Sequence, residues 1–137
     1  MSEKYTLFFD GCCKGNPGIG GAGAVLFKNQ IEIYSQSCFV GKNTTNNIAE
    51  YTGLLLGLEK AHELDIKTLY VKGDSMLVIK QMKNEFNVNS PLLKQYHKQA
   101  KLLEKQIGTV FYEHIYREYN KRADELANNA LRGNPTR

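Results

Sequence analysis

The chain has 137 residues, of which 42% are hydrophobic and 23% charged, a composition that is ordinary for a globular protein. This excludes a collagen-like or a disordered chain, and the longest apolar run, Leu54-Leu55-Leu56, is far too short to span a bilayer. The net charge of +4 comes from the second half: residues 1–70 carry six Lys or Arg against seven acids, and residues 71–137 carry twelve against seven. This mild bias fits either a polyanionic partner or a solvated, lysine-rich helix.

The length is that of one domain over residues 1–137, which we expect to be monomeric. Residues 1–4 lack the basic, apolar and small-residue pattern of a secretory leader. The three cysteines, with Cys12 next to Cys13 and Cys38 alone, fit neither a zinc site nor a disulfide framework. We therefore expect a cytoplasmic protein without membrane contact.

The first half of the chain begins with predicted strands. Residues 5–10 carry apolar side chains on both faces, which indicates a central strand that is covered on both sides. Six glycines and a proline in residues 11–23 predict a turn that leads into a hairpin. Residues 24–28 and 31–40 are predicted as two further strands, so that the opening is an antiparallel meander.

The pattern then changes to a helical period. Residues 44–46 offer N-caps for a helix whose apolar side chains recur between Ala49 and Leu64. We predict a strand at 67–72, helices at 75–83 and 91–105, a strand at 109–116 and a closing helix at 121–132. This order predicts an α/β fold with one five-stranded mixed sheet flanked by helices, antiparallel in its first three strands and parallel after them.

Two carboxylates stand out because they accompany apolar faces, where an unpaired charge is costly to bury. Asp10 ends the predicted central strand, although an Asp before Gly11 is also a common way to begin a turn. Glu50 lies on the same helix face as Leu54 and Gly57, which points it toward the sheet. Its alternative explanation is a favourable interaction with the helix N-terminus.

Two further carboxylates lie at predicted element boundaries. Asp74 follows a strand and would serve alone as an N-cap, and Asp124 in the first turn of the last helix would serve alone to stabilise the helix dipole. Together with the first two, however, they come to one edge of the sheet, where α/β proteins bind ligands. Clustered carboxylates repel one another unless cations neutralise them, and hard oxygen ligands suit Mg²⁺ or Mn²⁺. Such ions can support phosphodiester cleavage.

Four short motifs enclose these acids: Phe9-Asp10-Gly11 with Gly15-Asn16-Pro17-Gly18, Thr44-Thr45-Asn46-Asn47-Ile48-Ala49-Glu50, Gly73-Asp74-Ser75, and Ala123-Asp124-Glu125-Leu126-Ala127. With them the chain resembles type 1 ribonuclease H from residue 5 to about residue 131. Each motif alone is weak, but all four stand in the expected order on the expected strand or helix.

The resemblance implies a ribonuclease H-like fold and endonucleolytic cleavage of the RNA strand of an RNA–DNA hybrid, leaving 5′-phosphate and 3′-hydroxyl ends. It also implies two Mg²⁺ or Mn²⁺ ions per site, bound by Asp10, Glu50, Asp74 and Asp124. The residues implied to contact the hybrid are Gly11, Cys12, Cys13, Asn16, Thr45, Asn46, Asn47 and Ser75. Within this set, contacts of Asn16, Thr45 and Asn46 with 2′-hydroxyl groups would distinguish RNA from DNA, and Asn47 would turn toward the DNA strand.

The chain departs from the resemblance in the loop before the last acid. Many bacterial members carry a histidine there, and this loop has none. It is similar to an archaeal-like branch that has an arginine, so Arg117 is the candidate for that role. A guanidinium cannot act as a base at neutral pH, so Arg117 would act by electrostatics or by binding the product phosphate. We expect His114, within the preceding strand, to be structural.

A second departure is the absence of the basic, tryptophan-containing handle of several family members. Residues 84–90 carry no basic residue, and the chain has no Trp. Binding of the hybrid would then depend on five lysines, Lys80, Lys83, Lys94, Lys98 and Lys101. Lys94 and Lys98 belong to a stripe along one predicted helix, for which a solvated face is the alternative interpretation.

Two rival functions stay open. One is a nuclease of the same fold that cuts double-stranded RNA, which presents the same 2′-hydroxyl groups. The other is a non-catalytic module that only binds the hybrid, although retention of all four acids argues against it.

Overall fold

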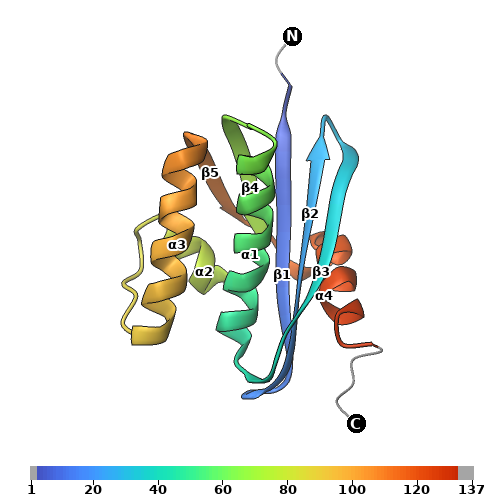
Figure 1. The fold of residues 1–137 in the computed structure, drawn as a ribbon, viewed down its shortest axis with the longest axis vertical. Coiled ribbons are helices and arrows are strands. Elements are labelled where there is room, and N and C mark those ends of the chain that lie inside the picture. Colours follow the sequence, from blue (N-terminus) through green and yellow to red (C-terminus); the bar gives the residue numbers. More distant parts are fainter. Residues whose placement is uncertain (1–2, 133–137) are drawn as a thin grey trace.

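The computed structural model describes residues 3–132, and its five strands form one mixed sheet in the order β3-β2-β1-β4-β5 (Figure 1). The strands are β1 (Tyr5–Gly15), β2 (Gly18–Lys28), β3 (Ile31–Thr44), β4 (Thr68–Gly73) and β5 (Thr109–His114). β1 pairs antiparallel with β2, and β2 with β3, whereas β4 pairs parallel with both β1 and β5. The predicted α/β fold and its mixed sheet are therefore confirmed.

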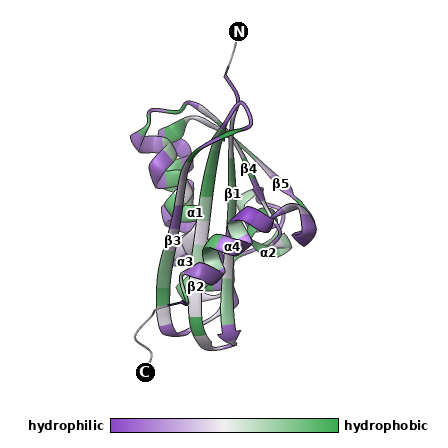
Figure 2. Cartoon of the chain, turned by 90° about the vertical axis from the view of Figure 1, so that its right-hand side faces the viewer, coloured by the Kyte–Doolittle hydropathy of each residue, from purple (hydrophilic) through white to green (hydrophobic). Residues whose placement is uncertain are grey.

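The helices cover the two faces of the sheet unequally. They are α1 (Asn46–Glu63), α2 (Met76–Met82), α3 (Pro91–Ile107), the short 3₁₀ helix η1 (Arg117–Tyr119) and α4 (Lys121–Asn129). α1, α2 and α3 pack on one face, and α4 alone lies across β1 and β2 on the other (Figure 2). The central strand β1 is thus covered on both sides, as its two apolar faces predicted.

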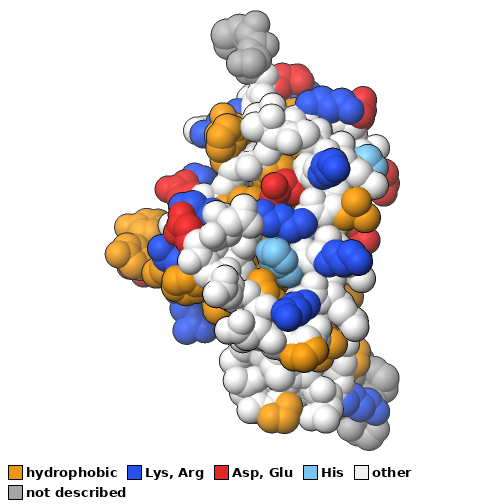
Figure 3. Space-filling model, turned by 90° about the vertical axis from the view of Figure 1, so that its left-hand side faces the viewer, with side chains coloured by type: hydrophobic (Ala, Val, Ile, Leu, Met, Phe, Trp, Pro, Cys, Tyr) orange, Lys and Arg blue, Asp and Glu red, His pale blue; other side chains and the backbone are white. Residues whose placement is uncertain are grey.

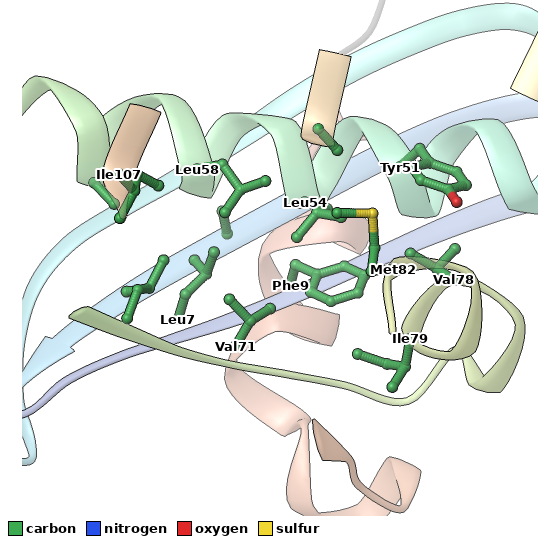
Figure 4. Packing of buried hydrophobic residues seen from close by; sticks show 14 of the residues in the cluster. Leu7, Phe9, Tyr51, Leu54, Leu58, Val71, Val78, Ile79, Met82 and Ile107 are labelled. Atoms are coloured by element: carbon green, nitrogen blue, oxygen red, sulfur yellow. The ribbon is translucent and has the colours of Figure 1, made fainter. Parts of the chain in front are cut away.

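The main core lies between the sheet and α1. Leu7 and Phe9 of β1 and Val71 of β4 face Leu54 and Leu58 of α1, and all five side chains are buried (Figure 4). Residues of α2 and α3 close this core at its sides. A smaller cluster on the other face joins Phe8, Val25 and Phe27 of the sheet to Ala123 and Leu126 of α4.

The predicted turn over residues 11–23 is wrong. β1 continues to Gly15 and β2 already begins at Gly18, so only Asn16 and Pro17 reverse the chain. The glycines serve close packing instead, because a Cβ at Gly11 would lie 2.3 Å from the backbone of α1 and one at Gly23 would lie 2.7 Å from the backbone of α4. As a consequence, Asp10 lies inside a strand and not at its end.

Other predicted boundaries move by a few residues. β3 runs on to Thr44 instead of ending at residue 40, β5 stops at His114 instead of 116, and α4 ends at Asn129 instead of 132. Thr45 is the N-cap of α1, as predicted, with its Oγ1 accepting from the Ile48 amide at 3.3 Å. Among the described residues, no helix is long and apolar enough to cross a membrane.

Candidate active site

Three of the four predicted acids lie close together, with Asp10 in β1, Asp74 directly after β4 and Glu50 near the start of α1. Asp10, Glu50 and Asp74 each offer a carboxylate oxygen, and these oxygens all lie within 4.8 Å of one another. Asp10 is 4% exposed, and Glu50 and Asp74 are half-buried. Three carboxylates so close together form a site of concentrated negative charge, which we call the acidic triad.

The acidic triad is assembled by close backbone packing between β1 and α1. Gly11 follows Asp10 and touches the backbone of Ala49 and Glu50, and Gly53 lies against the Asp10 carbonyl, where a Cβ would approach to 2.5 Å. Without side chains at these glycines, the first turn of α1 reaches the strand directly. Glu50 therefore points at Asp10 and not into solvent.

Asp74 reaches the triad through strand pairing. Phe9 of β1 pairs with Gly73 of β4 in the parallel register, so the residues that follow each of them, Asp10 and Asp74, come side by side. Ser75 is the N-cap of α2, with its Oγ accepting from the Val78 amide at 3.2 Å. The N-cap that the sequence allowed for Asp74 is thus provided by its neighbour, and the Asp74 carboxylate is left for the site.

Asp124 lies outside the triad, in the first turn of α4. Its side chain accepts a hydrogen bond from Asn128 Nδ2 at 3.1 Å. Its charge nevertheless acts on the triad, since it adds to the forces that raise the pKa of Asp10. The structure therefore brings three of the four predicted acids together and leaves the fourth beside them.

Burial and mutual repulsion shift the ionisation of the triad. Burial, followed by the charge of Asp74, raises the pKa of Asp10 to about 8. The pKa of Glu50 is also raised well above its ordinary value, by burial and then by the charges of Asp10 and Asp74. In the absence of a cation, Asp10 and Glu50 therefore hold their protons to a higher pH than free carboxyl groups do.

The donor set of the triad fits a divalent cation. Glu50 Oε1 and Asp74 Oδ2 are buried and accept no hydrogen bond within residues 3–132. None of the four acids forms a salt bridge with a Lys or Arg of that part of the chain. Buried carboxylate oxygens without cationic or donor partners are the ligands that hard ions such as Mg²⁺ and Mn²⁺ prefer.

A cleft of about 540 Å³ opens in front of the triad. Ten of the predicted site residues line it: the triad with Gly11, Cys12, Cys13, Asn46, Asn47, Ser75 and Arg117. Burial raises the pKa of the Cys12 thiol, which disfavours a thiolate nucleophile at this position. Among the predicted residues, the cleft is therefore lined by the three carboxylates, by Asn46 and Asn47 and by the guanidinium-bearing Arg117.

An adjoining depression carries the remaining predicted recognition residues. Asn16, Thr45 and Asn46 line it together with Ser90 and Leu93. Asn16 Oδ1 accepts from the Asn46 amide at 3.1 Å, which fixes the β1–β2 turn against the start of α1. This bond joins two segments 30 residues apart into one continuous polar surface beside the cleft.

The predicted lysines lie on a different part of the surface. Lys94 and Lys98 are exposed on α3 and line neither the cleft nor the adjoining depression. Lys80 and Lys83 pair with Glu85, and Lys101 donates to the Met82 carbonyl at 2.6 Å. Figure 3 shows basic side chains scattered over the face that carries α3 and not gathered into one patch.

Comparison with known proteins decides the family. A model of the family described as reverse transcriptase-like matches residues 8–130. Ribonuclease HI of Pseudomonas syringae pv. tomato is 38% identical over an alignment of 147 positions, which covers 96% of this chain and 94% of the relative. The chain belongs to the type 1 ribonuclease H family.

Solved ribonuclease H structures share the fold. The N-terminal RNase H domain of Rv2228c from Mycobacterium tuberculosis is 37% identical with a TM-score of 0.90, covering 95% of this chain and 94% of that one. LC11-RNase H1, solved in complex with an RNA/DNA hybrid, is 33% identical with a TM-score of 0.88, covering 93% and 96%. The chain spans about a third of the length (35%) of the full mycobacterial proteins that it matches.

Three residues that line the cleft were not predicted as part of the site, namely His114, Ile115 and Tyr116. His114, which we expected to be structural, lines the cleft at the end of β5, and Tyr116 lines it two residues further on. Their rings pack edge to face with centroids 6.0 Å apart. The sequence could not reveal this, because β5 ends earlier than its alternating pattern suggests and the chain then turns across the cleft.

Proposed function

We propose that this ribonuclease H hydrolyses the RNA strand of RNA–DNA hybrids and depends on divalent cations. The observation that carries the proposal is the acidic triad, whose buried oxygens lie within 4.8 Å of one another beside an open polar cleft. Clustered carboxylates cost stability unless cations or protons neutralise them, and such clusters are found preferentially at functional sites. The LC11-RNase H1 structure in complex with an RNA/DNA hybrid supports the choice of substrate.

Asp10, Glu50 and Asp74 would hold the cations, with Asp124 as a further ligand, and two Mg²⁺ or Mn²⁺ ions are the proposed complement. When bound, such ions activate a water molecule and stabilise the leaving oxygen of a phosphodiester. The protein groups do the remaining work. Cation binding requires Asp10 and Glu50, whose pKa values are raised, in their deprotonated form, and the close packing of α1 on β1 would keep both side chains in place.

Arg117 is proposed to act on the phosphate. It lies in η1 on the wall of the cleft that also carries His114 and Tyr116. Its guanidinium stays charged and can donate two parallel hydrogen bonds to a phosphate. It would therefore bind the product phosphate and stabilise the negative charge that develops on it.

Recognition of the RNA strand is proposed for the polar surface next to the cleft. Asn16, Thr45 and Asn46, with the backbone of residues 11–13, would follow the minor groove and contact 2′-hydroxyl groups. The bond from the Asn46 backbone amide to Asn16 Oδ1 supports this, since it keeps the Asn16 side chain beside the start of α1. Asn47 and Ser75, at the rim of the triad, would contact the adjoining nucleotides. We further propose that residues 1–137 act as one domain and as a monomer.

The test is a gel assay on end-labelled RNA–DNA hybrid, double-stranded RNA, single-stranded RNA and double-stranded DNA. Each substrate is incubated with Mg²⁺, Mn²⁺ or EDTA, and the Asp10→Asn variant is run beside the wild type. We expect internal cuts in the hybrid RNA that disappear in EDTA and in the variant. Additional cutting of duplex RNA would broaden the substrate range, whereas binding of the hybrid without any cleavage would overturn the proposal.

A further inference from the structure

The position of Asp124 depends on α4, which packs on the opposite face of the sheet from the helix that carries Glu50. α4 has only nine residues, and the acid that it carries stands apart from the acidic triad. A carboxylate on a short helix in partial contact with solvent has several accessible rotamers. Whatever orients it must therefore be found in its immediate surroundings.

One turn before Asp124, a buried amide ties α4 to the strand of the triad. Asn120 is 1% exposed, and its Nδ2 donates to the Phe9 carbonyl at 2.9 Å. Phe9 directly precedes Asp10 in β1. The Asp124 amide in turn donates to the Asn120 carbonyl at 3.0 Å, so the helix begins at a point set by the strand that carries Asp10.

One turn after Asp124, a second amide holds its side chain. Asn128 Nδ2 donates to the Asp124 carbonyl at 2.9 Å and to Asp124 Oδ1 at 3.1 Å. The side-chain amide of Asn128 thus donates hydrogen bonds to both the backbone and the carboxylate of Asp124. Only one of the two carboxylate oxygens takes part, so the other is left to accept a different partner.

We propose that Asn128 is a positioning residue that orients the Asp124 carboxylate as a metal ligand, on a helix whose start Asn120 fixes. The inference rests on the proposed function, because it assumes that Asp124 serves the cation site. Outer partners of metal ligands set the ligand's orientation, and their loss commonly costs 10–100-fold in metal affinity. A neutral amide is suited to this task, since a Lys or Arg would compete with the cation and an acid would repel Asp124.

A purely structural role predicts a different behaviour. If the two bonds of Asn128 only stabilise α4, Asn128→Ala should lower the thermal midpoint in EDTA and leave the response to metal unchanged. The positioning role predicts a midpoint in EDTA close to that of the wild type, because Ala is the better helix former and offsets the lost bonds, but a weaker response to metal. Stability and metal response therefore separate the two explanations.

The experiment compares wild type with Asn128→Ala, Asn128→Gln, Asp124→Ala and the double variant Asp124→Ala/Asn128→Ala. Asn129→Ala is the matched control, because it removes the same side chain from the next position of α4, which has no bond to Asp124. Two quantities are measured: the Mn²⁺ concentration that gives half of the metal-induced rise in thermal midpoint, and kcat and KM on RNA–DNA hybrid at fixed Mn²⁺.

We expect Asn128→Ala to raise the half-saturating Mn²⁺ concentration about tenfold and to lower kcat at limiting metal, with KM for the hybrid unchanged. Asn128→Gln should retain much of the wild-type response, since Gln and Asp interact at this helical spacing. In the Asp124→Ala background, Asn128→Ala should have no further effect, because its partner is already absent.

The inference fails if Asn128→Ala titrates with Mn²⁺ like Asn129→Ala, or if its effect persists in full without Asp124. These outcomes differ from failure of the proposed function. In that case the wild type itself would neither cleave hybrid nor be stabilised by Mn²⁺, and every variant would share this behaviour.

Discussion

Asp10 and Glu50 are the residues whose surroundings depart furthest from what their chemistry favours. Both are acids placed among carboxylates and away from water, and both have raised pKa values for that reason. Each is accessible to the cleft, so the repulsion can be relieved by a cation and not only by a proton. These two residues therefore lower the stability of the metal-free protein and form a site that a bound cation can neutralise.

Replacing Asp10 by Asn should separate stability from activity. Asp10→Asn removes one charge from a repelling cluster and keeps the side-chain volume, so the thermal midpoint in EDTA should stay the same or rise. Cleavage should fall by about 10³-fold or more, the scale on which catalytic groups act. Differential scanning fluorimetry and the gel assay measure the two effects. A large fall in the midpoint with activity retained would make Asp10 a structural residue.

The metal-free protein should lose stability as the pH rises. The pKa of Asp10 is raised to about 8 in the folded state, against an ordinary value of 3.8. Between these two pH values the folded state holds a proton that the unfolded state has released. Unfolding therefore becomes easier as the pH rises through this window, and Glu50 acts in the same direction.

Thermal midpoints in EDTA between about pH 5 and about pH 8 check this expectation, with Asp10→Asn as the comparison. The slope should be smaller in the variant, and it should not vanish, because Glu50 remains. With Mn²⁺ present the trend should weaken or reverse, since cation binding requires the deprotonated carboxylates. An identical slope in both proteins would show that Asp10 titrates normally.

The helices α1 and α4 pack closely on β1 and β2 because glycines of these strands stand at the points of contact. Gly11 admits the first turn of α1, and Gly21 and Gly23 admit α4, where a Cβ would meet helix backbone at 2.4 and 2.7 Å. Backbone cannot move aside as the end of a long side chain can. The glycines of β1 and β2 therefore determine how near the acids of two helices come to Asp10.

Adding one methyl group at this contact should displace α4. Gly23→Ala places a Cβ 2.7 Å from the Ala123 carbonyl and the Ala127 amide, so it should cost about 1–3 kcal/mol of unfolding free energy and lower cleavage by moving Asp124. The control is Gly41→Ala in β3, where no atom lies within 4 Å of the added Cβ. Urea denaturation of both variants measures the difference, and equal midpoints would contradict the close-packing account.

The molecule as a whole is mildly basic, but its lysines are unevenly available. Glu85 pairs with Lys80 and Lys83, and Lys101 is bound to the Met82 carbonyl and Glu104. Lys94 and Lys98 are exposed and form no ion pair within the described residues. Lys105, in the last turn of α3, is likewise exposed and outside these ion pairs, so electrostatic binding of a polyanion by α3 would depend on these three lysines.

Charge reversal on α3 should weaken hybrid binding and its dependence on salt. For Lys94→Glu/Lys98→Glu we expect weaker binding and a salt slope smaller by about 1–2, one unit for each lost phosphate contact. The control is Lys4→Glu/Lys67→Glu, which changes the net charge equally near the starts of β1 and β4, the ends of these strands away from Asp10 and Asp74. Fluorescence anisotropy at several salt concentrations measures both. If the two double variants have the same slope, α3 only carries a solvated face.

Much of the architecture follows from local patterns in the sequence. Apolar residues on both faces, Leu7 and Phe9 on one and Phe8 on the other, predicted a strand buried on both sides, and the spacing of apolar residues between Ala49 and Leu64 predicted α1 with its start at residues 44–46. Such patterns suffice because side-chain burial on a strand or helix repeats with a fixed period. The same patterns drew attention to Asp10 and Glu50, since charges beside apolar faces are rare.

Tertiary structure alone decided how the glycines and the acids are used. Residues 11–23 predict a turn from composition, yet most of them are strand, because pairing between β1 and β2 supplies their hydrogen bonds and two helices need their small size. The separation of Asp124 from the triad and the placement of His114 in the cleft depend on contacts between distant segments. Local periodicity determined which side chains are buried, while long-range packing determined which of them meet, because distances between elements are set by the residues that both elements place at their contact.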